Sequence, residues 1–317
     1  METLECNVHD CALVFEGGGY RESFSGGIAN VLLEQGIYFD FVCGLSAGAS
    51  STVNYISRDR WRMRESFLTG KRMGDTSGVR SILRGTRYFD AEAIYEESAC
   101  NGRLPFDWKT FQANPAQLCI QAFQRDSGRT VRFTKSDMTD VIRLMDLVRA
   151  SSTLPVVMKE LPVDGKIYYD GGLGEGAGLP LYLAESAGYD KFFFVATREQ
   201  GYRKKPPSKI EVEYYKHIAR GYPYYRNALL TRWERYNTEI ERIEHLAAEG
   251  RAYIVYPDQM RVSSGTIDNK KLIESYEQGH SQGIRDISQW RTFLFGSPTA
   301  GPAAPVTSTV NVLNSLN

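Results

Sequence analysis

Two short apolar runs, each ended by glycines and each followed by a helical pattern, do most to constrain the fold of this chain. The first run, residues 11–15, indicates a buried strand that ends at the glycines of residues 17–19. Apolar residues then recur at helical spacing over residues 26–35. A second apolar run, residues 39–43, leads into a glycine-flanked turn and a predicted helix over residues 47–56. This order of strand, helix, strand and helix predicts a βαβ unit and a mostly parallel sheet flanked by helices.

The alternation of strands and helices continues to about residue 197, after which the chain is mainly helical by pattern. Further strands are predicted over residues 117–123, 130–133, 166–169, 191–197 and 252–256. Further helices are predicted over residues 140–150, 179–188, 225–249 and 269–295. Residues 70–115 follow neither period and are interpreted as loops and short helices.

The length and the change of pattern together suggest three parts. The 317 residues suffice for one α/β domain with an appended region. We expect an α/β hydrolase domain over residues 1–200 and a mainly helical region over residues 201–295 that packs on it. Residues 296–317 are rich in Pro, Ala, Thr, Ser and Asn, and this composition predicts a disordered tail.

The overall composition is that of an ordinary globular protein and excludes several classes. Lys plus Arg and Asp plus Glu both number 38, so net charge gives no indication of a nucleic-acid partner. The five cysteines are scattered and form no C-x-x-C pair, which predicts neither a disulfide framework nor a metal site and favours a reducing, cytoplasmic compartment. No signal peptide and no run of about 18 apolar residues is found, so we expect no membrane span.

The pentapeptide Gly44-Leu-Ser-Ala-Gly48 matches the G-x-S-x-G nucleophile elbow. In such an elbow a tight turn between a strand and a helix exposes the central hydroxyl, and the helix N-terminus favours nearby negative charge. The pattern places Ser46 at this position. The alternative is a structural glycine turn in which Ser46 only caps the helix.

A second glycine-rich turn, Gly17-Gly18-Gly19, follows the first predicted strand. Backbone amides without side chains can converge on an oxyanion. The alternatives are a phosphate loop or a plain turn, but the G-x-G-x-x-G dinucleotide pattern fails because Glu22 stands where its last glycine would be. Arg21 could hold the loop or contact an anionic head group, although in isolation a surface salt bridge is the simpler interpretation.

A serine nucleophile needs a base. None of the four histidines lies in a glycine-rich or strand-end setting, and His217 and His245 fall in charged helical stretches where we expect exposed side chains. Asp170 follows a predicted strand and precedes two glycines, which allow close approach of another loop. Alone, Asp-Gly-Gly is a common turn.

Together, Gly-Gly-Gly-x-Arg, Gly-x-Ser-x-Gly and Asp-Gly-Gly in this order resemble the patatin-like phospholipase family. The segment Ala150-Ser-Ser-Thr-Leu-Pro155 resembles the one that this family places ahead of its aspartate, and the resemblance covers about residues 10–200. It implies a doubly wound α/β fold and hydrolysis of acyl esters of phospholipids and related lipids without a metal or other cofactor.

Carried onto this chain, the family pattern implies Ser46 as nucleophile, Asp170 as base without a catalytic histidine, and an oxyanion hole at Gly17, Gly18 and Gly19. Arg21 matches the family's basic residue in that loop. Glu22 departs from the glycine that often follows the basic residue, which puts in doubt the shape of the loop.

Two other functions stay open at this stage. One is an α/β-hydrolase esterase with a Ser–Asp–His triad, which would need His217, His245 or His280. The other is a lipid-binding or regulatory module with little turnover. Residues 198–236 mix aromatic with basic side chains and suggest peripheral contact with a lipid surface, the alternative being a helical cap packed on the α/β domain.

Overall fold

The computed structural model describes residues 4–68, 87–100 and 102–296. Its centre is a sheet in the order β5-β6-β3-β2-β1-β7-β8, with β4 paired to β3. The five strands from β3 to β8 along this order run parallel. Their bounds are β3 Gln117–Gln124, β2 Phe41–Leu45, β1 Ala12–Phe15, β7 Phe192–Val195 and β8 Ala252–Val255. β1, β2, β7 and β8 lack charged and amide side chains because helices cover both faces of the sheet, whereas β3 carries the buried Gln121.

One edge of the sheet is antiparallel. β4 (Thr130–Thr134) and β6 (Lys166–Tyr169) both pair with β3 in antiparallel orientation, and β5 (Pro162–Val163) pairs with β6. The sheet is therefore mixed and mostly parallel, which confirms the predicted α/β class. The reversed direction of β6 brings its end to the carboxyl edge of β3.

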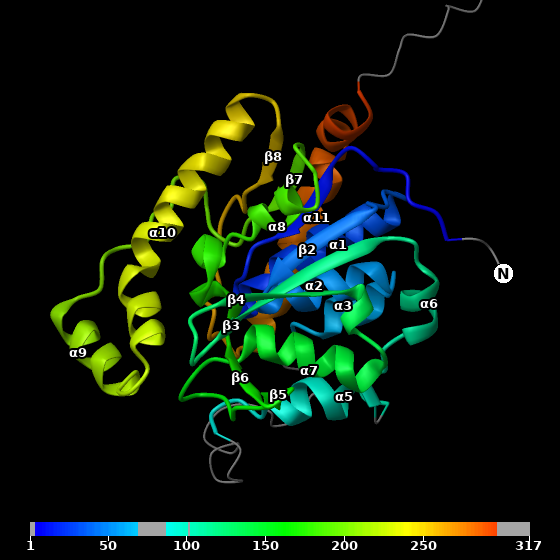
Figure 1. Cartoon of the computed structure of the whole chain (residues 1–317). Coiled ribbons are helices and arrows are strands. Elements are labelled where there is room, and N and C mark those ends of the chain that lie inside the picture. The colour runs from blue at the N-terminus through cyan, green and yellow to red at the C-terminus, as the bar shows by residue number, and fades with distance from the viewer. Residues whose placement is uncertain (1–3, 69–86, 101, 297–317) are drawn as a thin grey trace, which may run out of the picture.

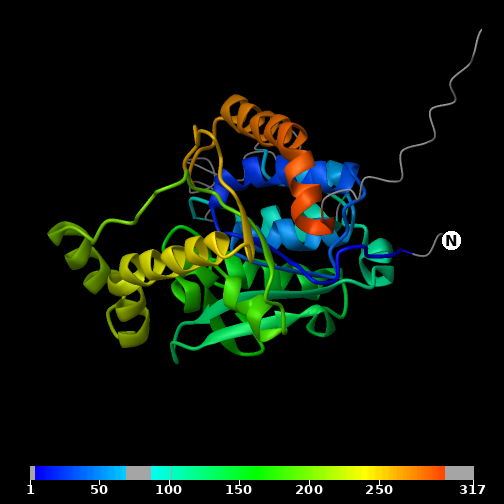
Figure 2. The same cartoon turned by 90° about the horizontal axis from the view of Figure 1, so that it is seen from above.

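Helices cover both faces of the sheet (Figures 1 and 2). Leu13 and Phe15 of β1 pack in one core with α1, α2, α7 and α11, whereas Ala12 and Val14 pack in a second core with α8 and α10. The bounds are α1 Glu22–Glu34, α2 Ala47–Ile56, α7 Val141–Ser152, α8 Leu181–Ser186, α10 Pro223–Ala248 and α11 Asn269–Phe295. Shorter helices are α3 Arg60–Glu65, α5 Ser98–Cys100, α6 Trp108–Ala113 and α9 Lys209–Ile218.

Two predicted boundaries near the glycine turns are wrong by a few residues. α1 begins at Glu22 rather than at residue 26, because Ser23 and Glu22 are held in the first turn by hydrogen bonds to Tyr20 and Ser51 and not by apolar contacts. β2 begins and ends two residues later than predicted, since the extended backbone continues to the serine turn.

The chain after residue 200 is mainly helical, as expected, but it also supplies β8 to the sheet. α11 crosses α1 in close contact (Figure 2). A Cβ atom on Gly279 would clash with the carbonyl oxygen of Phe24, and one on Gly27 would lie 2.5 Å from the amide nitrogen of His280. The two glycines thus let the helices meet backbone to backbone.

The boundary at residue 200 stays a prediction. The predicted tail beyond Gly296 lies outside the described residues, as do residues 70–86 and 101 of the predicted loops.

Candidate active site

Ser46 occupies a sharp turn between β2 and α2. Its backbone has φ +56° and ψ −132°, a conformation that is rare for a residue with a side chain. Such outliers are kept where the surrounding structure enforces them, often at functional sites. The flanking glycines show how the turn is enforced. A Cβ on Gly44 would clash with the carbonyl oxygen of Gly48, and a Cβ on Gly48 would lie 2.8 Å from those of Phe15 and Glu16.

The register of the sheet brings Asp170 next to Ser46. In the ladder, Leu45 of β2 pairs with Gln121 of β3, and Tyr169 at the end of β6 pairs with Phe123. Because β6 runs antiparallel to β3, the residues that follow Tyr169 return toward Leu45. The Gln121 side-chain amide fixes this turn by donating to the carbonyl of Gly171 at 2.8 Å.

The Ser46 hydroxyl donates to Oδ2 of Asp170 at 2.5 Å, across 124 positions of sequence. The other carboxyl oxygen, Oδ1, accepts the N–H of Gly172 at 2.7 Å, and the Asp170 amide donates to the carbonyl of Thr153 at 2.8 Å. Ser46 is 8% exposed and Asp170 is 6% exposed. Burial raises the pKa of the Asp170 carboxyl above its ordinary value, and it outweighs the opposing charge of Arg232.

Ser151 holds the serine turn from a third element, the end of α7. Its hydroxyl accepts the backbone N–H of Ser46 at 2.9 Å. Sequence reasoning singled out residues 150–155 only as a family feature and gave Ser151 no role. The segment contacts both halves of the site, because Ser151 binds Ser46 and the carbonyl of Thr153 binds the amide of Asp170.

The three glycines of the first turn differ in what their amides do. The N–H of Gly17 donates to the carbonyl of Gly178 at 3.0 Å, so it is already occupied. This hydrogen bond corrects the expectation that Gly17 serves an oxyanion. Within the described residues, the amides of Gly18 and Gly19 have no acceptor, and Gly19 lines the same cavity as Ser46.

Arg21 is not in the surface salt bridge that its isolated position suggested. The side chain is 6% exposed, and its Nε donates to the carbonyl of Thr197 at 3.1 Å. The amide of Thr197 in turn donates to Glu16 at 2.6 Å. Arg21 therefore ties the glycine turn to the end of β7. Burial lowers its pKa, with a further contribution from the charge of Arg198.

Glu22, the departure from the family pattern, is fully buried at the start of α1. Its carboxyl accepts the Ser51 hydroxyl at 2.8 Å, and burial raises its pKa to about 8. Since the folded chain keeps this proton above the ordinary carboxyl range, Glu22 stabilises the fold at low pH, and that contribution is lost as the pH rises toward 8.

We expect Glu22→Gln to remove this pH dependence. Between pH 6 and pH 8 the free energy of unfolding of the wild type should fall by up to about 1 kcal/mol per pH unit more than that of the variant. Urea unfolding at several pH values measures the difference, with the exposed Glu92→Gln as matched control. Parallel curves for wild type and Glu22→Gln would show that Glu22 is already ionised in the folded chain.

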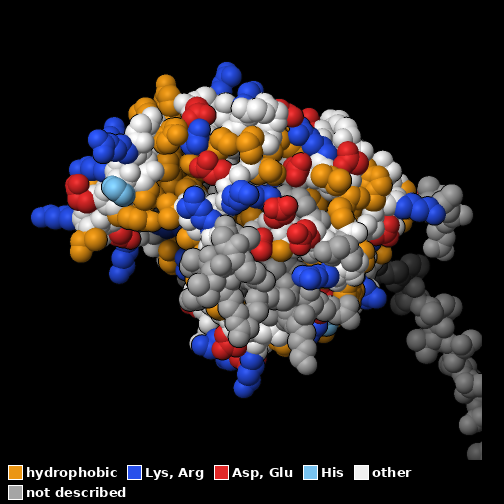
Figure 3. Space-filling view, turned by 90° about the horizontal axis from the view of Figure 1, so that it is seen from below, with side chains coloured by type: hydrophobic (Ala, Val, Ile, Leu, Met, Phe, Trp, Pro, Cys, Tyr) orange, Lys and Arg blue, Asp and Glu red, His pale blue; other side chains and the backbone are white. Residues whose placement is uncertain are grey.

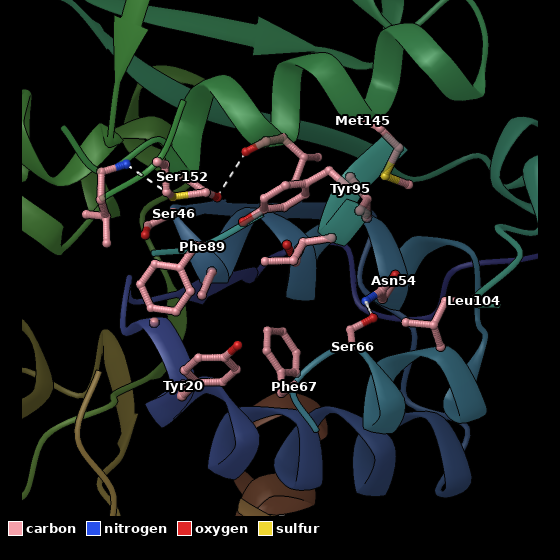
Figure 4. A pocket seen from close by; sticks show the side chains of 18 of the residues that line it. Tyr20, Ser46, Asn54, Ser66, Phe67, Phe89, Tyr95, Leu104, Met145 and Ser152 are labelled. Atoms are coloured by element: carbon pink, nitrogen blue, oxygen red, sulfur yellow. Dashed lines mark hydrogen bonds between the residues drawn. The ribbon is translucent and has the colours of Figure 1, made fainter. Parts of the chain in front are cut away.

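An apolar cavity opens beside Ser46 (Figure 4). Ser46 and Tyr20 lie toward one end, and Leu104 and Met145 lie at the other. The apolar side chains that line it come from α2, α7 and the segments around them: Val53, Phe67, Leu68, Phe89, Ile94, Leu104, Met145, Val148, Leu154 and Met158. A cavity of this composition suits an aliphatic chain whose polar end lies at Ser46.

The four histidines all lie in the described part of the chain, and none lines this cavity. His217 and His245 are exposed, as expected. His9 contacts Asp40 at 2.9 Å and His280 contacts Glu34 at 2.8 Å. Among the described residues, no three His, Cys, Asp or Glu side chains come together as candidate metal ligands.

Comparisons with known proteins find matches among solved structures and among protein families. Among solved structures, VipD from Legionella pneumophila matches at 11% identity with a TM-score of 0.42, over 87% of this chain and 66% of that chain. The chain thus spans slightly less than two thirds of that protein's chain. No curated protein sequence matches. The family described as a domain of unknown function (DUF6363) matches residues 222–295. The family of patatin-like phospholipases matches residues 13–183, which is more than half of the chain, and the chain belongs to that family.

Proposed function

We propose that this chain is a serine acyl hydrolase that cleaves carboxylic ester bonds of phospholipids, lysophospholipids or related lipids through a Ser46–Asp170 dyad. The observation that carries the proposal is the 2.5 Å hydrogen bond from Ser46 to Asp170 at the end of an apolar cavity. Nucleophile and base are within the distance that proton transfer needs, and the cavity offers space for the acyl chain.

The reaction proceeds in two steps. Ser46 Oγ attacks the ester carbonyl while Asp170 takes its proton, and the tetrahedral oxyanion accepts the amides of Gly18 and Gly19. Collapse of this intermediate breaks the ester bond, and Asp170 returns the proton to the leaving alcohol. Water deprotonated by Asp170 then attacks the acyl-enzyme, which releases the fatty acid and regenerates Ser46.

A fluorophosphonate probe tests the proposal directly. We expect the probe to label Ser46, as located by peptide mass spectrometry, and prior labelling to stop hydrolysis of a phospholipid. A lipid-binding or regulatory module predicts no labelling and no turnover. Label on another serine, or turnover that survives complete labelling, would contradict the dyad.

The triad alternative has its own test. Because no histidine lines the cavity, we expect His217→Gln, His245→Gln and His280→Gln to hydrolyse esters at the wild-type rate. Loss of activity in any one folded variant would favour the triad.

We further propose that residues 198–236 contact lipid surfaces peripherally. This stretch holds ten Lys and Arg against four Asp and Glu in a chain of zero net charge. α9 projects from the body of the molecule, and basic and apolar side chains gather on that end (Figures 2 and 3). Ile210 is 84% exposed and Tyr214 is 49% exposed on its outer face. No helix of the described residues is long and apolar enough to cross a bilayer.

Co-sedimentation with vesicles checks this contact. We expect binding to vesicles that contain an anionic phospholipid, and about ten-fold weaker binding for the pair Ile210→Asp and Tyr214→Ser, since two anchors are lost and a charge of the wrong sign is added. Ile284→Asp on α11, where the apolar side chain is 45% exposed, is the control. Equal binding of the pair and the control would contradict a role of α9.

A further inference from the structure

Four cationic side chains gather on the Asp170 side of the candidate site. They are Arg21, Arg198, Lys204 and Arg232, and none of them lines the apolar cavity. Arg232, on α10, lies against the Asp170-Gly-Gly turn. Its Nε donates to the carbonyl of Ala177 at 3.2 Å. Its Nη2 lies so close to Gly172 that a Cβ atom on this glycine would be only 2.6 Å from it. In the described structure, the two Nη groups of Arg232 have no hydrogen-bond acceptor.

Lys204 approaches the same place from the segment before α9. Its backbone is fixed by Asn237, which accepts the amide at 2.8 Å and donates to the carbonyl at 3.0 Å. Its Nζ lies 4.3 Å from the centroid of the Tyr236 ring and forms no ion pair within the described ranges. Burial lowers the pKa of Lys204 to about 7, with the charge of Arg232 as the next cause.

Within the described residues, the carboxylates nearby form no ion pair with these cations and make their hydrogen bonds to other groups. Glu16 accepts the amide of Thr197 at 2.6 Å and the hydroxyl of Tyr236 at 3.0 Å. Both oxygens of Asp170 are taken by Ser46 and Gly172. Arg198 lies over the Tyr202 ring at 4.3 Å, and its Nε is buried without a hydrogen-bond partner. Positive charge that is partly buried and lacks partners is unfavourable unless an anion joins it.

We propose that Arg232 and Lys204 bind the phosphate of a phospholipid head group while its acyl ester lies at Ser46. The inference rests on the proposed function and deepens it by assigning the head-group phosphate to two residues outside the segment that matches the patatin-like phospholipases. None of the four side chains of the cationic cluster lines the acyl cavity, whereas the charges of Arg232 and Lys204 act on Asp170, so the two ends of such a lipid would bind at separate places around the dyad. A guanidinium offers paired N–H donors that match phosphate, and the lysine adds a point charge.

A matched pair of substrates separates head-group binding from chemistry. A lysophosphatidylcholine and a monoacylglycerol of the same acyl chain present the same ester, but only the first carries a phosphate. We define selectivity as the ratio of their kcat/KM values. We expect this ratio to fall about ten-fold or more in Arg232→Gln and in Lys204→Met, mainly through KM, since each variant loses a charge-assisted contact. Arg232→Lys should restore part of it.

Arg242→Gln is the control, because this arginine of the same helix is paired with Glu185 and Glu239. An unchanged ratio in both Arg232→Gln and Lys204→Met would overturn the proposal, as would an equal fall in Arg242→Gln. Inorganic phosphate that binds the wild type competitively while the substrate ratio stays unchanged in the variants would assign the cluster to free phosphate and overturn the lipid assignment.

Binding to Ser46→Ala keeps this test independent of turnover. We expect the Kd ratio of the same two lipids to shift about ten-fold when Arg232→Gln is added. If the wild type hydrolyses neither lipid but the Kd ratio shifts, the proposed function fails and the phosphate site stands. If hydrolysis is observed and neither ratio shifts, the phosphate site fails alone.

Discussion

Ser46→Ala is expected to lower kcat by about 10⁴-fold or more on both a short-chain p-nitrophenyl ester and a phospholipid, because the covalent intermediate can no longer form. The fold should be unaffected. Alanine has the same backbone preferences as serine at φ +56°, and the amide that donates to Ser151 is retained. The measurement is the steady-state rate with each substrate, together with the thermal unfolding midpoint of each protein.

Ser57→Ala provides the matched control for this variant. Ser57, the residue after α2, is buried like Ser46, but its hydroxyl donates to the carbonyl of Asn54 and it does not line the cavity. We expect wild-type rates from it. Activity of Ser46→Ala within ten-fold of the control, in a folded protein, would remove Ser46 from the mechanism.

The elements of the fold follow from local patterns where those patterns are apolar and periodic. The helix over residues 269–295 and the strand over residues 166–169 were predicted with the bounds that the structure shows. The start of α1 was missed because Glu22 and Ser23 are polar. Their burial depends on hydrogen bonds to residues of other turns, which a periodicity search does not detect.

The family resemblance implied that Ser46 and Asp170 lie together, and the structure places them in contact, but the contacts around them were not predicted. The pairing of Ser46 with Asp170 was implied by three motifs that together resemble the family. No single one of these motifs indicates a hydrogen-bond partner 124 positions away. The contact forms because β6 runs antiparallel to β3. The local sequence patterns do not predict this register, and only the resemblance to the family indicated the pair. The hydrogen bond of Gly17 and the burial of Arg21 depend on where Gly178 and Thr197 come to lie.

The cationic cluster shows a different limit. Lys204 and Arg232 lie in stretches that look like solvated charge in sequence, and both were counted only as part of a basic and aromatic region. α10 turns Arg232 inward and the segment before α9 does the same for Lys204, so that aromatic rings and other cations surround them. The inward turn is a tertiary property, and no spacing rule along the chain encodes it.

Asp170→Asn is expected to lower kcat/KM by about 10²- to 10⁴-fold, since an amide can keep the position of Ser46 but cannot accept its proton. The wild type should lose activity as the pH falls through the raised pKa of Asp170, at a pH above the ordinary value of about 4. Rates of the wild type between pH 4 and pH 9, with Asp170→Asn measured alongside, check both statements. If the residual activity of Asp170→Asn falls equally steeply at low pH, the group whose titration limits activity is not Asp170.

The same substitution should make the folded chain more stable at pH 8. A carboxyl whose pKa is raised by folding contributes stability at low pH, where it is protonated in both states, and loses that contribution as the pH rises from about 4 through the folded value. The amide that replaces the carboxyl in Asp170→Asn stays neutral throughout, so the advantage of the variant should grow with pH and vanish near pH 4. Thermal unfolding midpoints of the two proteins at both pH values give the comparison. A buried carboxylate that lowers the free energy of unfolding but is needed for activity is the pattern expected of a functional site. If Asp170→Asn is instead less stable than the wild type at pH 8, Asp170 is a structural residue.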